Sequence, residues 1–182
     1  MPQEESHEFL DHDEYHARWE DNFWGKDGGL QPGQAFDAKR SSPALTDLLK
    51  QSGLEVAGKR VLVPGCGRGY DLVEFVRAGA AAAVGLELAP TAQREAAAYL
   101  ADTLTPAELA NAEVHTGDFF KWEHPTHAAW DVAYGARLPC SADYMDVLLP
   151  LGFTLVKEYA VPAELSHPGR GGKEAMLLFR KD

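Results

Sequence analysis

A glycine-rich turn is the first part of the sequence whose residue types suggest chemistry. Within VLVPGCGRGYD (61–71), an apolar segment runs into Gly65, Gly67 and Gly69, and a helix is expected to follow. Glycine allows positive φ and lets a ligand approach the backbone, and a helix N-terminus offers free N–H groups and a positive dipole. Alone, the turn is weak evidence, because ordinary tight turns have the same composition. Its G-x-G-x-G spacing also differs from the Walker A pattern and from the GxGxxG of dinucleotide folds.

Two further positions make the turn more specific. VGLELAP places Glu87 at the end of a second apolar segment, about twenty residues after the glycines, where acidic residues bind ribose hydroxyls in Rossmann-like sites. GDFF places Asp118 and Phe119 after a third segment, and an acidic acceptor beside an aromatic ring suits adenine. Because ligands of open α/β sheets bind at the carboxyl ends of strands, these positions together predict a nucleoside-binding site.

Such a site requires strands that alternate with helices. The pattern predicts strands at 60–64, 81–87, 112–120 and 129–136, and helices at 41–53, 70–78, 91–104 and 141–152. Ser42 is the expected N-cap of the first helix, Pro43 suits its first turn and Gly53 its end. The alternation predicts a mostly parallel sheet with helices on both faces. FTLVKEYAV and EAMLLFRKD are joined by a loop too short for a helical crossover, so we expect antiparallel neighbours.

Composition excludes several classes of protein. The chain has 182 residues, 45% of them hydrophobic and 25% charged, which predicts one ordered domain. Its net charge of −11 argues against broad binding to nucleic acid, and no apolar run reaches the roughly 18 residues of a membrane helix. MPQEESHEFLDHDEY is not typical of a signal peptide. Two cysteines form no disulfide framework, so we expect a cytoplasmic protein.

The motif residues resemble class I S-adenosylmethionine-dependent methyltransferases. RVLVPGCGRGYD, VGLELAPTA and GDFF are similar, more narrowly, to the thiopurine S-methyltransferase-like family, which includes thiol, halide and thiocyanate methyltransferases. Trp19 and Phe23 in YHARWEDNF, and Phe36 ahead of SSPAL, resemble the aromatic lid of that family. The resemblance implies a Rossmann-like three-layer α/β sandwich with a mostly parallel sheet and a C-terminal antiparallel strand. Residues 1–40 would form a tail and lid, and 41–182 the core of a single domain.

The resemblance also implies S-adenosyl-L-methionine as cofactor and a role for each motif residue. The turn residues Gly65, Cys66 and Gly67 would contact the cofactor, Glu87 would bind ribose, Asp118 and Phe119 would hold adenine, Tyr134 would lie near the sulfonium, and Trp19, Phe23 and Phe36 would close the site. Aromatic faces attract cations, which agrees with a lid over a sulfonium. No catalytic residue is assigned.

The sequence departs from the family pattern at two places. Gly135 follows the aromatic of the fourth strand, where the family has an acidic or otherwise polar residue. LPCSADYMDVLLPLGF then leads directly into the last helix, where the family has a fifth strand, flanking helices and a Pro-Gly-Gly turn. One βα segment is missing, so we expect six strands rather than seven, with a different neighbour beside the fourth strand.

We therefore expect methyl transfer from S-adenosylmethionine to a small soft nucleophile, with a thiol as the first choice. The alternatives are an oxygen- or nitrogen-directed small-molecule methyltransferase, and a non-catalytic cofactor-binding or partner protein, which the missing segment motivates. The glycine spacing opposes a nicotinamide oxidoreductase. We expect no metal site, since His7, His12 and His16 do not form the HExxH pattern. A monomer without nucleic-acid or membrane partners is expected, with a dimer over the shortened sheet edge as the alternative.

Overall fold

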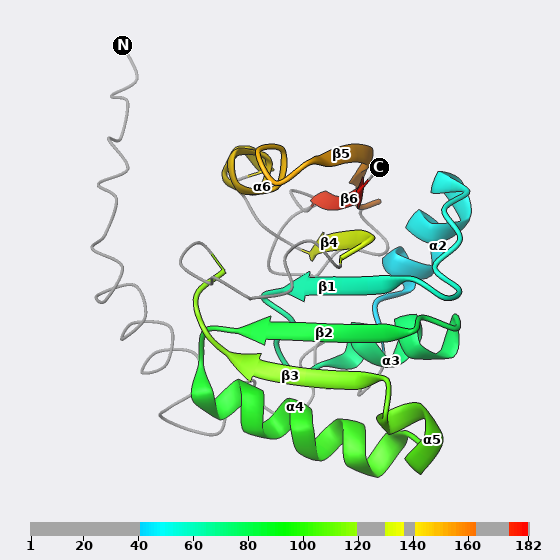
Figure 1. Ribbon diagram of the computed structural model, residues 1–182, viewed down its shortest axis with the longest axis vertical. Coiled ribbons are helices and arrows are strands. Elements are labelled where there is room, and N and C mark those ends of the chain that lie inside the picture. The colour runs from blue at the N-terminus through cyan, green and yellow to red at the C-terminus, as the bar shows by residue number, and fades with distance from the viewer. Residues whose placement is uncertain (1–40, 120–129, 137–140, 163–174, 182) are drawn as a thin grey trace.

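A computed structural model describes residues 41–119, 130–136, 141–162 and 175–181. Their strands form one six-stranded sheet in the order β3-β2-β1-β4-β6-β5 (Figure 1). The elements, in chain order, are α2 (Pro43–Ser52), β1 (Arg60–Pro64), α3 (Tyr70–Arg77), β2 (Ala82–Glu87), α4 (Pro90–Thr103), α5 (Pro106–Leu109), β3 (Ala112–Thr116), β4 (Val132–Ala136), α6 (Ser141–Leu148), β5 (Phe153–Ala160) and β6 (Ala175–Lys181). None of the described helices is long and apolar enough to cross a membrane.

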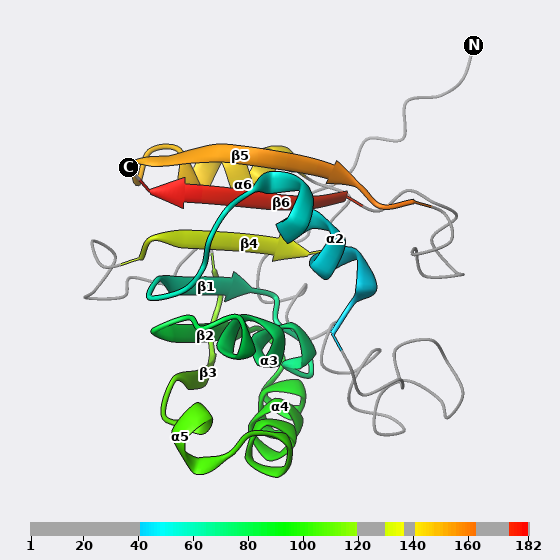
Figure 2. The same cartoon turned by 90° about the vertical axis from the view of Figure 1, so that its right-hand side faces the viewer.

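Strand directions agree with the predicted mostly parallel sheet. β1 pairs in parallel with β2 and β4, and β2 pairs in parallel with β3. β6 is antiparallel to both of its neighbours, β4 and β5, and its arrow opposes the others in Figure 2. The predicted antiparallel pairing of the last two strands is therefore confirmed.

The expected change beside the fourth strand is also confirmed. β4 pairs directly with β6, from Val132 opposite Arg180 to Ala136 opposite Met176. The sheet of the described residues thus has six strands, as predicted, and its edges are β3 and β5. The side of β4 that faces away from β1 is occupied by a strand of this chain.

Alternating residues of the strands build two hydrophobic cores. On one face, Val61 and Val63 of β1 pack with Tyr134 of β4 and with apolar residues of α2, α3 and α4. On the other face, Leu62 and Ala133 pack with Leu148 of α6. Figure 2 shows α2, α3 and α4 on the near side of the sheet and α6 behind it. This arrangement is the predicted three-layer sandwich.

The start of α2 corrects one sequence expectation. Pro43 lies in its first turn and Gly53 ends it with φ 64°, both as predicted. Ser42 is the N-cap residue, as predicted, but its side chain makes no capping bond. Its backbone N–H donates instead to the carboxylate of Asp71 at the start of α3, 3.0 Å away. This hydrogen bond ties the start of α2 to the start of α3.

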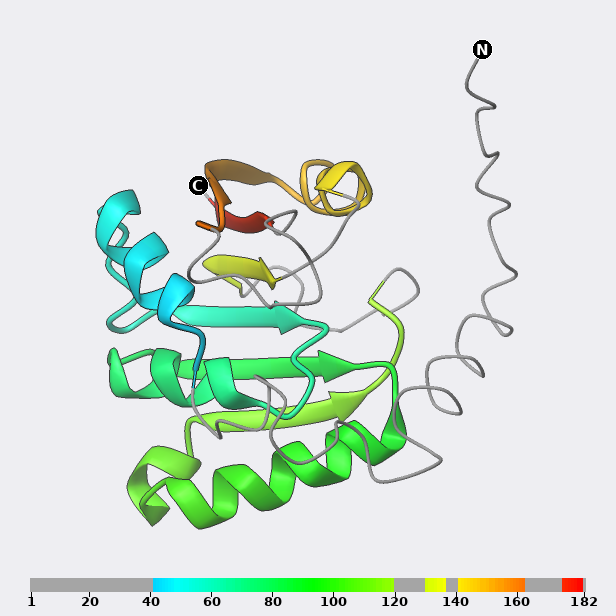
Figure 3. The same ribbon diagram turned by 180° about the vertical axis from the view of Figure 1, so that it is seen from behind.

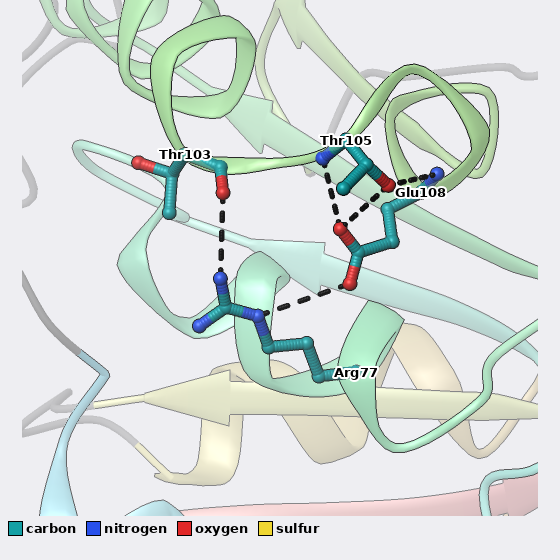
Figure 4. A network of polar contacts seen from close by, with 4 residues as sticks. All are labelled: Arg77, Thr103, Thr105 and Glu108. Carbon is teal, nitrogen blue, oxygen red and sulfur yellow. Dashed lines mark hydrogen bonds and ion pairs between the residues drawn. The ribbon is translucent and has the colours of Figure 1, made fainter.

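The short helix α5 was not expected from the sequence. Thr105 and Glu108 form a reciprocal capping box, in which the Thr105 hydroxyl accepts the Glu108 N–H and the Glu108 carboxylate accepts the Thr105 N–H. Arg77, at the end of α3, joins this network: its guanidinium donates to the Thr103 carbonyl at 3.3 Å and lies 4.0 Å from Glu108 (Figure 4). The network links α3, α4 and α5 at the end of the sheet away from the glycine turn.

Replacing Glu108 with glutamine should lower the free energy of unfolding at neutral pH but not at low pH. Hydrogen bonds from the backbone and side chain of Thr105 lower the pKa of Glu108 from its ordinary value of 4.5. The ionised carboxylate therefore stabilises the folded state above about pH 4.5, and this stabilisation is lost as the pH falls through the folded-state pKa. Urea unfolding at about pH 7 and about pH 3 should show the gap between wild type and Glu108→Gln closing.

The exposed Asp102 of α4 offers the control, since Asp102→Asn changes a carboxylate on the same surface without touching this capping box. A gap for Glu108→Gln that persists at low pH would contradict the assignment.

Candidate cofactor site at the ends of three strands

The glycine turn joins the end of β1 to the start of α3, as predicted. The Gly65 N–H donates to the carbonyl of Leu86 at the end of β2, 2.7 Å away, so the turn is tied to the neighbouring strand. Gly67 has φ 54°, and a Cβ added there would meet no atom within 4 Å. The backbone of the turn is therefore open at Gly67, where a ligand has room to approach it.

Glu87 occupies the end of β2 and is the buried acid of the site. Glu87 is only 3% exposed. One carboxylate oxygen accepts the N–H of Gly67 at 2.8 Å, and the other accepts the N–H of Ala89 at 3.0 Å. A carboxylate oxygen has more than one lone pair, which makes the group a suitable acceptor for hydroxyls as well as for N–H groups.

Asp118 and Phe119 follow β3, which ends earlier than predicted, at Thr116. The Gly117 N–H donates to the backbone carbonyl of Glu87 at 2.9 Å, so the start of this segment is joined to the end of β2. Phe119 is partly buried against the second core, and Asp118 is half-buried. The structure thus brings the carboxyl ends of β1, β2 and β3 to the same end of the sheet, where Figure 3 shows the three arrowheads together.

Cys66 is packed within the turn. Burial raises the pKa of its thiol well above the ordinary value, and the negative charge of Glu87 raises it further. Such a thiol is protonated near neutral pH and is a poor nucleophile. Its sulfur lies against Gly85 of β2, where an added Cβ would be 2.5 Å from Sγ. Cys66 therefore packs between the turn and Gly85 of β2.

Gly85 was missed by the sequence analysis. An isolated glycine inside a strand is a known sign of close approach by another segment. Gly85 in β2 is such a sign, and the segment that approaches it is the glycine turn.

Tyr134 lies in the middle of β4 with its side chain fully buried. Its hydroxyl donates to Asp71 at 3.3 Å and lies 3.4 Å from the sulfur of Met176, and its ring meets Phe75 edge-on at 5.3 Å between centroids. Its place near the sulfonium stays a prediction. Asp71, which sequence reasoning did not single out, connects this tyrosine to the start of α2.

The predicted lid residues Trp19, Phe23 and Phe36 lie outside the described residues. The same holds for His7, His12 and His16. Their roles stay predictions from the sequence.

Solved structures define the class of this fold. Magnesium protoporphyrin IX methyltransferase from Synechocystis, with S-adenosylmethionine bound, has a TM-score of 0.56 at 15% identity, covering 96% of this chain and 93% of that chain. A methyltransferase from Thiobacillus denitrificans in complex with S-adenosylhomocysteine has a TM-score of 0.51 at 12% identity, covering 79% of this chain and 93% of that chain. The predicted Rossmann-like methyltransferase fold is confirmed.

A family profile then identifies the chain more narrowly. The profile described as thiopurine S-methyltransferase matches residues 10–140, and the chain belongs to this family. It is an S-adenosylmethionine-dependent methyltransferase, as the motifs predicted. No curated protein sequence matches the chain. The matched part of the chain ends at residue 140, immediately before α6, where the sequence departs from the family pattern.

The described residues fit S-adenosylmethionine. The backbone is open at Gly67, and beside it lies the buried carboxylate of Glu87, a group that accepts hydrogen bonds of the kind ribose hydroxyls donate. Asp118 and Phe119, joined to the same strand end through Gly117, are the residues that would hold adenine. The roles of Glu87, Asp118 and Phe119 toward ribose and adenine stay predictions from the sequence.

The Gly85→Ala substitution should destabilise the protein by about 1–3 kcal/mol, because the added methyl group overlaps the Cys66 sulfur. Adding Cys66→Ala should recover part of this loss, since it removes the nearest atom that the methyl group meets, while Leu72 Cδ1 at 2.9 Å and Cys66 Cβ at 3.0 Å remain. Urea unfolding of the wild type, both single variants and the double variant measures the coupling. Additive effects would contradict the contact.

The Glu87→Ala substitution should weaken binding of S-adenosylmethionine by about 1–3 kcal/mol, because ribose hydroxyls lose a charged acceptor. Calorimetric titration of the folded variant measures this change. Glu113→Ala is the matched control, since Glu113 is an exposed glutamate of the next strand. An unchanged affinity in Glu87→Ala would refute the ribose assignment.

Proposed function

We propose that the enzyme transfers a methyl group to the sulfur of a small thiol. The observation that carries this proposal is the match of residues 10–140 to the thiopurine S-methyltransferase profile. S-adenosylmethionine supplies a methyl group that is already activated by a positively charged sulfur. The chain's own task is to hold the cofactor and the acceptor in line, and such positioning supplies roughly 7–11 kcal/mol in well-oriented reactions.

The hydrogen bonds of two carboxylates near the turn, Glu87 and Asp71, support a soft nucleophile. Glu87 accepts two backbone N–H groups, and Asp71 accepts the Ser42 N–H and the Tyr134 hydroxyl. Both side chains therefore serve as hydrogen-bond acceptors that position neighbouring segments. A thiol with a pKa of about 8.5 already supplies a few per cent of thiolate near neutral pH and makes little demand on a general base.

Gly135 supports the same assignment. It lies in β4 opposite Leu177 of β6, at the position that the family fills with an acidic or otherwise polar residue. Without a side chain, this position offers no group for proton transfer. An oxygen acceptor, whose hydroxyl ionises less readily than a thiol, would lose more from this change.

A comparison of thiophenol with phenol tests the proposal, because the two acceptors differ only in the nucleophilic atom. With labelled S-adenosylmethionine, thiophenol should be methylated at least about tenfold faster. Iodide and thiocyanate in parallel reactions test the wider range of soft nucleophiles in the family.

The pH dependence gives a second readout. For two thiols of different acidity, the rise of kcat/KM with pH should follow the pKa of each thiol, since the free thiolate is the reacting form. Faster methylation of phenol would favour the oxygen-directed alternative. Cofactor binding without transfer to any acceptor would favour the non-catalytic alternative.

A further inference from the structure

The glycine turn takes part in an ion pair between two residues, Arg68 and Glu95, that the sequence did not assign to the site. Arg68 lies between Gly67 and Gly69, and its Nε is 2.6 Å from the Glu95 carboxylate of α4. The Arg68 side chain is 13% exposed and that of Glu95 is 33% exposed. Burial of the guanidinium lowers the pKa of Arg68, but the hydrogen bond and charge of Glu95 outweigh this effect and raise it overall. The pair is short, charge-assisted and largely shielded from solvent.

The surrounding contacts show what this pair joins. A Cβ added at Gly69 would lie 3.2 Å from the Cβ of Ala96, so α4 packs directly on the turn. α4 begins at Pro90, three residues after Glu87, whose carboxylate accepts the Gly67 N–H. The turn is therefore held on one flank by Glu87 and on the other by Glu95.

We propose that Arg68 and Glu95 are positioning residues that hold the glycine turn in its cofactor-binding shape. Gly67 and Gly69 give the turn backbone freedom, and a flexible turn would have to be ordered when S-adenosylmethionine binds. Order that exists before binding improves affinity. The inference rests on the binding of S-adenosylmethionine at this edge of the sheet, and it is independent of the acceptor that the proposed function names.

A second ion pair, between α3 and α5, provides a control. Arg77 of α3 lies 4.0 Å from Glu108 and donates to the Thr103 carbonyl, at the opposite end of the helices. This pair also links α3 to the end of α4, but it lies beside α5, at the end of the sheet opposite to the arrowhead of β1 (Figure 1). A purely structural role would make the two pairs equivalent toward the cofactor.

The test compares Glu95→Gln with Arg77→Gln. Glutamine keeps the shape of Glu95 and removes its charge, and the dissociation constant for S-adenosylmethionine should rise about tenfold or more. Arg77→Gln should leave it within about twofold, even if it lowers the melting temperature as much. Titration calorimetry at matched salt gives the affinities, and kcat at saturating S-adenosylmethionine should change less than KM for the cofactor.

Two further variants complete the experiment. Arg68→Gln added to Glu95→Gln should raise the dissociation constant by less than about twofold more, because the interaction is already lost. Arg68→Lys keeps the charge with a single-point donor and should give an intermediate loss of about threefold, which serves as the test if Glu95→Gln does not fold.

Equal effects of Glu95→Gln and Arg77→Gln on cofactor affinity would overturn the inference, and so would an unchanged affinity in folded Glu95→Gln or Arg68→Lys. A failure to methylate thiols would contradict the proposed function without altering this comparison, because the titrations contain no acceptor.

Discussion

The hydrogen bonds of the buried Glu87 carboxylate are the interactions on which the candidate site depends. A charge that is 3% exposed requires hydrogen-bond donors around it. Those donors are the N–H groups of Gly67 and Ala89, from the turns that follow β1 and β2. The backbone carbonyl of Glu87 also accepts the N–H of Gly117 after β3. One residue therefore joins three strand ends, and its burial ties the open backbone of the turn to the sheet.

Local pattern predicted most of the fold but not the contacts that shape the site. Strand and helix periods located every described strand, and Glu87 was placed correctly at the end of β2 because an acid ending an apolar run is visible in sequence. The Asp71–Tyr134 hydrogen bond and the Arg68–Glu95 pair join residues far apart along the chain, and no local signal specifies such partners. α5 was missed although TPAE contains a capping box, since a helix of 4 residues has no apolar period to detect.

In the six-stranded sheet, β4 pairs with β6 on the side away from β1. β6 lies beside β4 and hydrogen-bonds it along five residue pairs, from Val132–Arg180 to Ala136–Met176. Backbone pairing needs no particular side chain, so a strand removed from the middle of a sheet is replaced by the next strand about 4.8 Å away. The replacement also places Met176 beside the Tyr134 hydroxyl, on the face where Asp71 joins α2 and α3. The core beneath the site is thereby continuous across the junction.

The position of β6 has a consequence for the order in which the protein folds. β6 follows both of its neighbours in sequence, yet it lies between them in the sheet. During synthesis, β4 and β5 therefore leave the ribosome with facing edges that have no strand to pair with. Unpaired edges of this kind invite pairing with other chains. The parallel part of the sheet and β5 become parts of one sheet only when residues 175–181 insert between β4 and β5.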